Sequence, residues 1–150
     1  MHVPAKVDYG LRALLSLAAA GGPQTAELLS EREGLPPRFL GAILADLRRA
    51  GLVASQRGTD GGYRLARPAS AVTVAEVIRI LDGPLAEVRG LRPEATSYEG
   101  SSAHLQDVWV AVRASLRLVL EEVTLADLVS GDLPEQLVRL TALPGAWEPH

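Results

Sequence analysis

The hydrophobic positions of the first twenty residues recur with the period of an α-helix. They follow the i, i+3, i+4, i+7 spacing that gathers apolar side chains on one helix face, at Leu11, Leu14, Leu15 and Ala18. This pattern predicts a helix over residues 5–20. The run Gly-Gly-Pro at 21–23 does not continue a helix, so we expect the element to end there.

Two more helices are predicted before residue 52, and a glycine turn separates them. Thr25 is a suitable N-cap for a short helix that reaches residue 33. Gly34 lets the chain reverse, Pro37 is suited to the first turn of a third helix, and Gly51 is suited to its C-terminal cap. Two short helices joined by a glycine turn form the helix-turn-helix pattern.

Two short extended segments follow, at 51–57 and 62–68, with Val, Tyr and Leu as strand-forming residues. The residues between them, Asp60, Gly61 and the adjoining Gly62, predict a tight turn with positive φ. A helix, a helix-turn-helix and a two-stranded hairpin in this order form a winged helix-turn-helix. The predicted fold class is therefore mainly α with a small β-hairpin.

A fourth helix is predicted to begin after Thr73. The motif TVAE favours a capping box, in which Thr73 caps the helix and Glu76 reaches back to it. Gly83 and Pro84 end this helix. The residues that follow, 84–103, are rich in Gly, Pro, Ser and Glu and predict an irregular loop.

A long helix with one continuous apolar face is expected after the loop. The face comprises Leu105, Val108, Trp109, Val112, Leu116, Val119, Leu120 and Val123. A second copy of the same helix would cover this face and give a symmetric dimer, whereas the alternative is packing on the first helix. Thr124 starts a last short helix, which Gly131 ends.

These elements divide the chain into four parts. They are a winged helix-turn-helix domain (1–83), an irregular loop (84–103), a dimerisation helix with its short follower (104–131) and a C-terminal tail (132–150).

Composition excludes several classes of function. The chain has no cysteine, which rules out disulfides and thiolate metal sites. Its three histidines have no metal-ligand spacing, and no nucleophile elbow, Walker loop or dinucleotide fingerprint occurs. Apolar runs stay below the roughly 18 residues of a membrane span, and the start lacks the pattern of a cleaved signal. We expect a soluble, cytoplasmic protein that is not an enzyme and has no cofactor.

Charge is distributed unevenly along the chain. The net charge is −3, yet residues 36–67 hold six arginines against Asp46 and Asp60. Residues 84–150 hold five basic and ten acidic side chains. Because a local field attracts a polyanion more than the overall sum does, the third helix and the hairpin are the expected contact surface for a nucleic acid.

Five segments in order resemble the Rrf-two (Rrf2) family of winged-helix regulators, which includes IscR, NsrR and CymR. They are YGLRALLSLA, GLPPRFLGAILADLRRAGLVASQRGTDGGYRLARP, VTVAEVIRILDGPL, LQDVWVAVRASL and VTLADLV. The most specific part is the family pattern LVxSxRGxxGGYxLxR. The resemblance covers residues 3–130 and implies a homodimeric bacterial transcription factor, with third helices in major grooves of double-stranded DNA and wings in minor grooves.

The resemblance and the charges together suggest which residues contact DNA. The candidates are Lys6, Thr25, Pro37, Arg38, Phe39, Arg48, Arg49, Arg57, Gly58 and Gly61, with Arg64 and Arg67 as further phosphate contacts. Arg57 would enter a minor groove, or else pair with an acidic neighbour in the hairpin. Phe39 would touch a thymine methyl group, or else belong to the core, as Leu40 is expected to do.

Many members of this family hold an iron–sulfur cluster on three cysteines and one further ligand. Here the cysteines are missing and Gln106 stands where a ligating histidine is found, so no cluster is expected. Asp8 resembles a ligand position in some relatives, but alone it makes no site. Such a member could respond to a small molecule, to a partner protein or only to its own concentration. A pocket near Trp109 and Tyr98 is one candidate for a ligand site.

The leading hypothesis is a sequence-specific DNA-binding regulator, acting as a homodimeric repressor. The alternative is a winged-helix protein-interaction module without direct DNA binding, which the acidic net charge and the small side chains of Gly41 and Ala42 favour. Steep loss of affinity with salt is expected of the first and not of the second.

Overall fold

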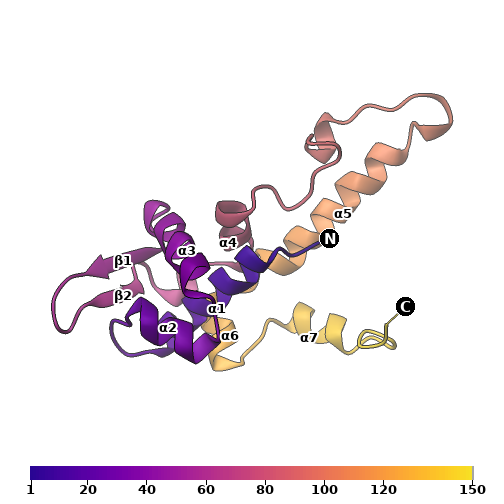
Figure 1. Cartoon of the computed structure of the whole chain (residues 1–150). Coiled ribbons are helices and arrows are strands. Elements are labelled where there is room, and N and C mark those ends of the chain that lie inside the picture. The colour runs from indigo at the N-terminus through magenta and orange to yellow at the C-terminus, as the bar shows by residue number, and fades with distance from the viewer. Residues whose placement is uncertain (150) are drawn as a thin grey trace.

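The computed structural model describes residues 1–149, so His150, the last residue of the predicted tail, lies outside the described residues. The elements are α1 (Ala5–Ala19), α2 (Ala26–Glu33), α3 (Pro37–Arg49), β1 (Val53–Gln56), β2 (Gly62–Leu65), α4 (Val74–Leu81), α5 (Leu105–Leu120), α6 (Leu125–Ser130) and α7 (Glu135–Thr141). Short 3₁₀ turns lie at η1 (Ala69–Ala71), η2 (Pro93–Ala95) and η3 (Gly100–Ser102). The predicted fold class, mainly α with one hairpin, is confirmed (Figure 1).

Helix α1 lies at the centre of the winged domain and packs against α2, α3, α4, α6 and β2. The core contains fully buried side chains from these helices and from the segment before β1, including Leu14, Leu29, Leu44, Leu47, Leu52 and Val77, and β2 packs its half-buried Tyr63 and Leu65 against it. The periodic leucines of the first helix are therefore explained by its neighbours, since Leu14 is fully buried and Leu11 and Leu15 pack partly against the core.

Caps and glycines fix the ends of the helices largely as predicted. The Thr25 hydroxyl accepts a hydrogen bond from the Leu28 N–H at 3.2 Å, and Gly34 closes α2 with a φ of 62°. The Thr73 hydroxyl likewise accepts from the Glu76 N–H. The predicted return contact from Glu76 is wrong, because its carboxylate pairs with Arg67 at 2.6 Å instead.

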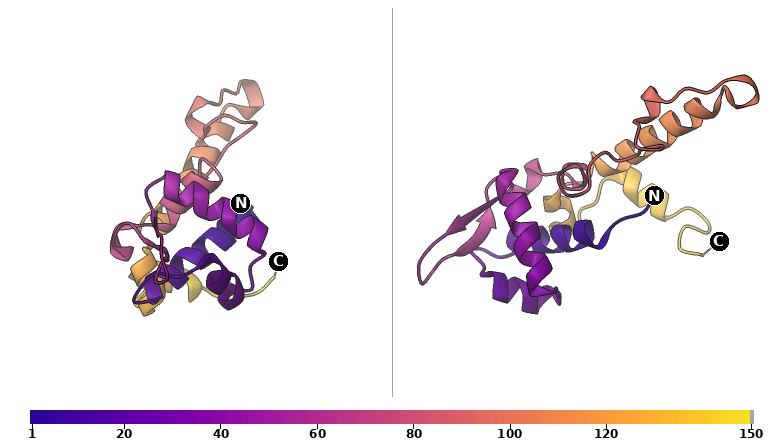
Figure 2. Two further views of the ribbon diagram at one scale, coloured as in Figure 1. Left: turned by 60° about the vertical axis from the view of Figure 1, so that its left-hand side comes forward. Right: turned by 45° about the horizontal axis from the view of Figure 1, so that its top comes forward.

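The wing is an antiparallel hairpin in which Val53 pairs with Leu65 and Gln56 with Gly62. The turn lies where it was predicted, but the glycines with positive φ are Gly58 at 110° and Gly62 at 143°, and not Gly61. The hairpin projects from one end of the molecule, whereas α5 extends toward the other end, as Figure 2 shows in two further views.

Helix α5 is shorter than the apolar face predicted over residues 105–123. It ends at Leu120, and Val123 turns into the core of its own chain. The Val74 N–H donates to the Val123 carbonyl at 3.0 Å, and the Leu125 N–H donates to the Val72 carbonyl at 3.0 Å. These two bonds return the chain to the winged domain, where Leu125 is fully buried and α6 packs on α1.

Candidate nucleic-acid interface

Helix α3 presents two chemically different faces. Its apolar face is buried and consists of Leu40, Ile43, Leu44 and Leu47. The opposite face is open, and Phe39 is 65% exposed at its start. The structure thus answers the question left open by the sequence: Leu40 belongs to the core, while Phe39 is available to a partner. Pro37, Arg38, Gly41 and Ala42 are exposed on the same helix.

Arg57 lies at the start of the wing turn, and its side chain is exposed. Among residues 1–149 it takes part in no ion pair, so the acidic neighbour considered as its alternative partner is not in contact with it. A Cβ on Gly61 would lie 2.4 Å from the Gln56 carbonyl oxygen. The tight turn therefore has no room for a side chain at that position, and it leaves Arg57 at the tip of a narrow hairpin.

Three of the predicted phosphate contacts have partners within the domain. Lys6 Nζ lies 2.7 Å from an Asp46 carboxylate oxygen, and Arg49 pairs with the same carboxylate. The Lys6 ammonium is the main cause that lowers the pKa of Asp46. Arg67 joins Glu76 and donates to the Ala71 carbonyl at 2.6 Å, which makes it a link between the wing and α4.

Arg48 and Arg64 are exposed and have weaker internal contacts. Arg48 donates to the Ser55 hydroxyl at 3.2 Å, which joins the end of α3 to β1. Arg64 reaches only the carbonyl of its neighbour Leu65, at 3.4 Å. Both guanidinium groups keep donors for a phosphate, since each has five N–H groups.

The apolar face predicted on α5 is only partly covered in the single chain. None of the residues of this helix is fully buried, and Val108 and Val112 are 50% and 44% exposed. Leu120, at the end of the helix, packs partly against the core of the winged domain. Leu118, which the predicted face omits, is also exposed, on another side of the helix. The other predicted interface positions, Leu105, Trp109, Leu116 and Val119, are half-buried.

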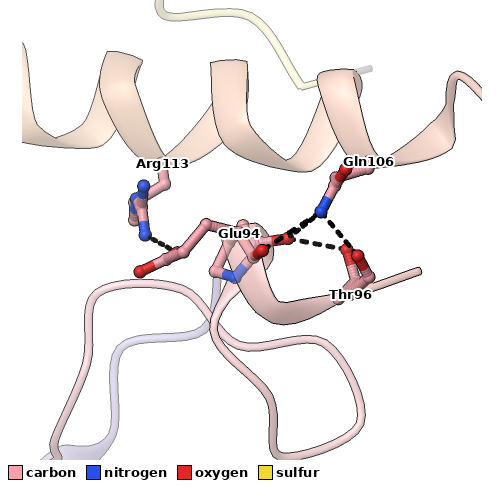
Figure 3. Close-up of polar contacts among 5 residues, drawn as sticks. Glu94, Thr96, Gln106 and Arg113 are labelled. Carbon is pink, nitrogen blue, oxygen red and sulfur yellow. Dashed lines mark hydrogen bonds and ion pairs between the residues drawn. The ribbon is translucent and has the colours of Figure 1, made fainter.

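The irregular loop lies along α5 and is held there by side-chain contacts (Figure 3). The Gln106 amide nitrogen donates to the carbonyls of Glu94 at 3.2 Å and Thr96, with a longer contact of 3.4 Å to Pro93. One and two turns further on, Trp109 donates to the Tyr98 hydroxyl at 3.1 Å and Arg113 pairs with Glu94. The sequence did not reveal these contacts, which join residues ten or more positions apart.

Two cavities lie where the loop, α4 and α5 meet. The larger, of about 660 Å³, is lined by the first residues of the chain, by the loop and by Trp109, Val112 and Leu116. It contains the aromatic ring of Trp109, which was expected near a pocket, but Tyr98 does not line it. The smaller, of about 430 Å³, lies between α4 and the other side of α5 and is lined by arginines.

Metal donors are scarce in this region. The chain has no cysteine, and the described residues contain no group of three His, Asp or Glu side chains placed to hold a metal ion. Asp8, the candidate on α1, is exposed and lies 3.6 Å from Arg12 one turn away. Across residues 1–149 no helix has the length and apolar character needed to cross a membrane.

Comparison with known proteins agrees with this geometry. Residues 3–131 match the model of the Rrf2 family, described as an iron-dependent transcriptional regulator. The HTH-type transcriptional regulator Rv1287 of Mycobacterium tuberculosis is 46% identical over 142 residues, which cover 93% of this chain and 88% of that protein.

Two solved structures extend the similarity to the fold. CymR, the global cysteine regulator of B. subtilis, superposes with a TM-score of 0.75 at 31% identity, covering 87% of this chain and 98% of that one. IscR of T. potens superposes with a TM-score of 0.71 at 35% identity, covering 88% of each chain. These relatives are transcriptional regulators and not enzymes. The family match, the sequence identity and the shared winged helix show that this chain is a DNA-binding transcriptional regulator and belongs to the Rrf2 family.

Proposed function

We propose that this chain binds a two-fold symmetric DNA sequence as a homodimer and represses transcription in the bacterial cytoplasm by occupying that sequence. The observation that carries the proposal is the pair of open surfaces at one end of the molecule. The first turn of α3 and Arg57 of the wing are exposed. Helix α3 and the wing lie toward one end of the molecule, whereas α5 extends toward the other end (Figure 1).

Each DNA contact is assigned from the chemistry of an exposed side chain. Arg38 has the donors to bind a guanine edge, and the Phe39 ring can pack against a thymine methyl group in the major groove. Arg57 enters a narrow minor groove, where the negative potential is strongest. Gly58 and Gly61 let the wing backbone approach, and Pro37 directs the start of α3 toward the bases.

Further contacts hold the phosphates. Arg48, Arg49 and Lys6 supply cations around the ends of α3 and α1, and the capped start of α2 at Thr25 offers backbone N–H groups. Asp46 neutralises part of this charge in the free protein. Binding is therefore expected to include a large electrostatic component that salt weakens.

The dimer forms through α5. Val108 and Val112 are exposed on the apolar side of this helix, and an isologous contact covers the same residues on both copies. Two copies related in this way place two α3 helices on one side of a DNA duplex, so the bound sequence is expected to be an inverted repeat.

The protein acts without an iron–sulfur cluster, although the family is described as iron-dependent. Such clusters are held mainly by thiolates, and this chain has none. Gln106 uses its amide nitrogen to hold backbone carbonyls of the loop. The residues present thus do not fit the cluster, and direct contacts between the loop and α5 take the place of a cofactor.

Selection of bound duplexes from random DNA tests the proposal, with wild-type protein, Arg57→Ala and the matched control Arg139→Ala. Arg139 is an exposed arginine on α7 that pairs only with Glu135 one turn away among the described residues, so its replacement removes a surface charge outside the proposed DNA contacts. We expect an inverted repeat for the wild type and the control, and a weakened or lost motif for Arg57→Ala. With ~6 phosphates contacted, affinity should fall about 10³-fold between 50 and 200 mM salt. No enrichment by intact dimers would contradict direct DNA binding and favour the protein-interaction alternative.

A further inference from the structure

Four arginines from three parts of the chain line the smaller cavity, together with Glu94 and residues 83–86. Arg79 comes from α4, Arg92 from the irregular loop, and Arg113 and Arg117 from α5. Its volume of about 430 Å³ lies in the range of small-molecule sites, which span roughly 300–1,000 Å³. Arg113 and Arg117 are four residues apart and therefore project from the same side of α5.

The cavity has a positive net charge, although the segment that supplies most of its arginines is acidic overall. Residues 84–150 have five arginines and ten acidic side chains, yet three of those five arginines line the cavity. Two carboxylates lie among the four guanidinium groups: Glu94 pairs with Arg113, and Glu121 pairs with Arg79 and Arg117. Four positive and two negative groups leave an excess of two positive charges.

The arginines retain donors for a further anion. Arg92 has neither an ion pair nor a side-chain hydrogen bond in the part of the chain that the structure describes, and it is exposed. Arg113 and Arg79 each contact one carboxylate and have other N–H groups unused. A planar fork of donors suits carboxylate and phosphate oxygens, and charge-assisted bonds to them are strong.

We propose that this cavity binds a small metabolite that carries two negative charges or more, as phosphate or carboxylate groups. The ligand would lie between Arg92, Arg113 and Arg79, and its negative charges would neutralise the excess positive charge of the cavity. The larger cavity is a weaker candidate, because Val112 and Leu116 line it and belong to the face that the proposed dimer covers.

An anion bound at this site would affect the angle between the winged domain and helix α5. Helix α4 is part of the winged core, with Ala75, Val77 and Ile78 buried, whereas Arg113 and Arg117 belong to the dimer helix. An anion that bridges these elements fixes the angle between the winged domain and α5. In a dimer that angle sets the separation of the two α3 helices, so this regulatory consequence rests on the proposed function, while the binding itself does not.

Binding is tested on the full-length protein without DNA, by isothermal titration calorimetry with inorganic phosphate, pyrophosphate and citrate, against sodium chloride of equal ionic strength. We expect at least one of the three anions to bind once per chain with a Kd below ~1 mM. Arg92→Gln and Arg113→Gln should each weaken that binding ~10-fold or more, because a charge-assisted hydrogen bond is lost. Arg139→Gln should leave it unchanged.

Amide hydrogen exchange provides a second measurement, which locates the bound anion in the structure. Bound anion should slow exchange of the amides in residues 79–94 and 113–117, and leave the wing unaffected. Arg92 has no partner within residues 1–149, so Arg92→Gln tests the site without disturbing the fold. The proposal is overturned if none of the three anions binds with a Kd below ~1 mM, or if Arg92→Gln and Arg113→Gln both bind like the wild type. Neither result bears on DNA binding.

Discussion

The backbones of Gln24 and Tyr63 form a two-way hydrogen-bonded bridge. The Gln24 N–H donates to the Tyr63 carbonyl at 2.8 Å, and the Tyr63 N–H donates to the Gln24 carbonyl at 2.7 Å. This pair attaches the second strand of the wing to the segment that leads into α2. This main-chain bridge helps to hold the wing in its orientation relative to the helix-turn-helix, in addition to the side-chain contact between Arg48 and Ser55.

Replacement of Gly62 is expected to break this attachment. A Cβ at Gly62 would lie 2.6 Å from the Gln24 carbonyl carbon and oxygen, on a backbone with a φ of 143°. Gly62→Ala should lower the free energy of unfolding by about 1–3 kcal/mol, measured by urea denaturation. Gly58→Ala is the matched control, because its Cβ would meet no atom within 4 Å, and its loss should be smaller. Equal losses for the two variants would argue against the steric explanation.

Phe39 and Leu40 are neighbours on α3, but their replacement by alanine is expected to affect different properties: DNA binding for Phe39 and folding stability for Leu40. Leu40→Ala should lower the free energy of unfolding by about 2–5 kcal/mol, because the side chain is buried in the core. Phe39→Ala should change it by less than ~0.5 kcal/mol, because the ring is exposed. In DNA binding, Phe39→Ala should reduce specific affinity ~10-fold while nonspecific affinity is kept. A Phe39→Ala protein with wild-type specificity would remove this residue from the interface.

A charge in the apolar face of α5 is expected to separate the proposed dimer. Val112→Asp would place a carboxylate against its own symmetry mate, where desolvation and repulsion both oppose association. Light scattering after size-exclusion chromatography should show a monomer. Leu118→Asp is the control, since Leu118 is also exposed but lies outside the predicted face. Dimers of Val112→Asp, or loss of the dimer only in Leu118→Asp, would mean that another face associates.

Asp46 is expected to stabilise the folded protein through its ion pairs with Lys6 and Arg49. Its pKa is below the ordinary 3.8, chiefly because Lys6 hydrogen-bonds to it, so the folded state favours the ionised form. The contribution to stability is complete well above pH 3.8 and is lost as the pH falls through the lower folded-state value. Asp46→Asn should be less stable than the wild type at neutral pH, and this difference should disappear at acidic pH in thermal melts.

The same substitution should have the opposite effect on DNA affinity. Without the carboxylate, Lys6 and Arg49 lose their internal counter-ion and become available to phosphates. We expect Asp46→Asn to bind DNA more tightly and with a steeper dependence on salt. Unchanged affinity and an unchanged salt slope would show that neither cation reaches the backbone of the duplex.

Much of the fold could be predicted because its signals are local. Thr25 as a cap, Gly34 as a left-handed turn and the glycines of the wing act on residues within a few positions of themselves. The exposure of Phe39 was also accessible from the sequence. Leu40, Ile43, Leu44 and Leu47 already form a complete i, i+3, i+4, i+7 stripe, which leaves Phe39 outside it.

The sequence could not show which of several possible partners a charged side chain contacts. Glu76 had a local partner in its own N-cap, and the sequence favoured that contact, but the folded hairpin brings Arg67 within 2.6 Å. A guanidinium is a stronger partner for a carboxylate than a neutral backbone N–H, so the distant contact prevails. Only the tertiary structure could show that Arg67 is held within the protein and is less available to DNA than Arg48 or Arg57.

The sequence by itself therefore determined the order of elements, the helix caps and the wing, because helical period, capping and turn geometry depend on neighbouring residues. Tertiary structure alone decided the Gln24–Tyr63 bridge, the return of Leu125 to the core and the gathering of Arg79, Arg92 and Arg113 around one cavity. Each of these joins segments far apart in the chain. Their meeting depends on the packing of the whole chain, and no local pattern of residues encodes that arrangement.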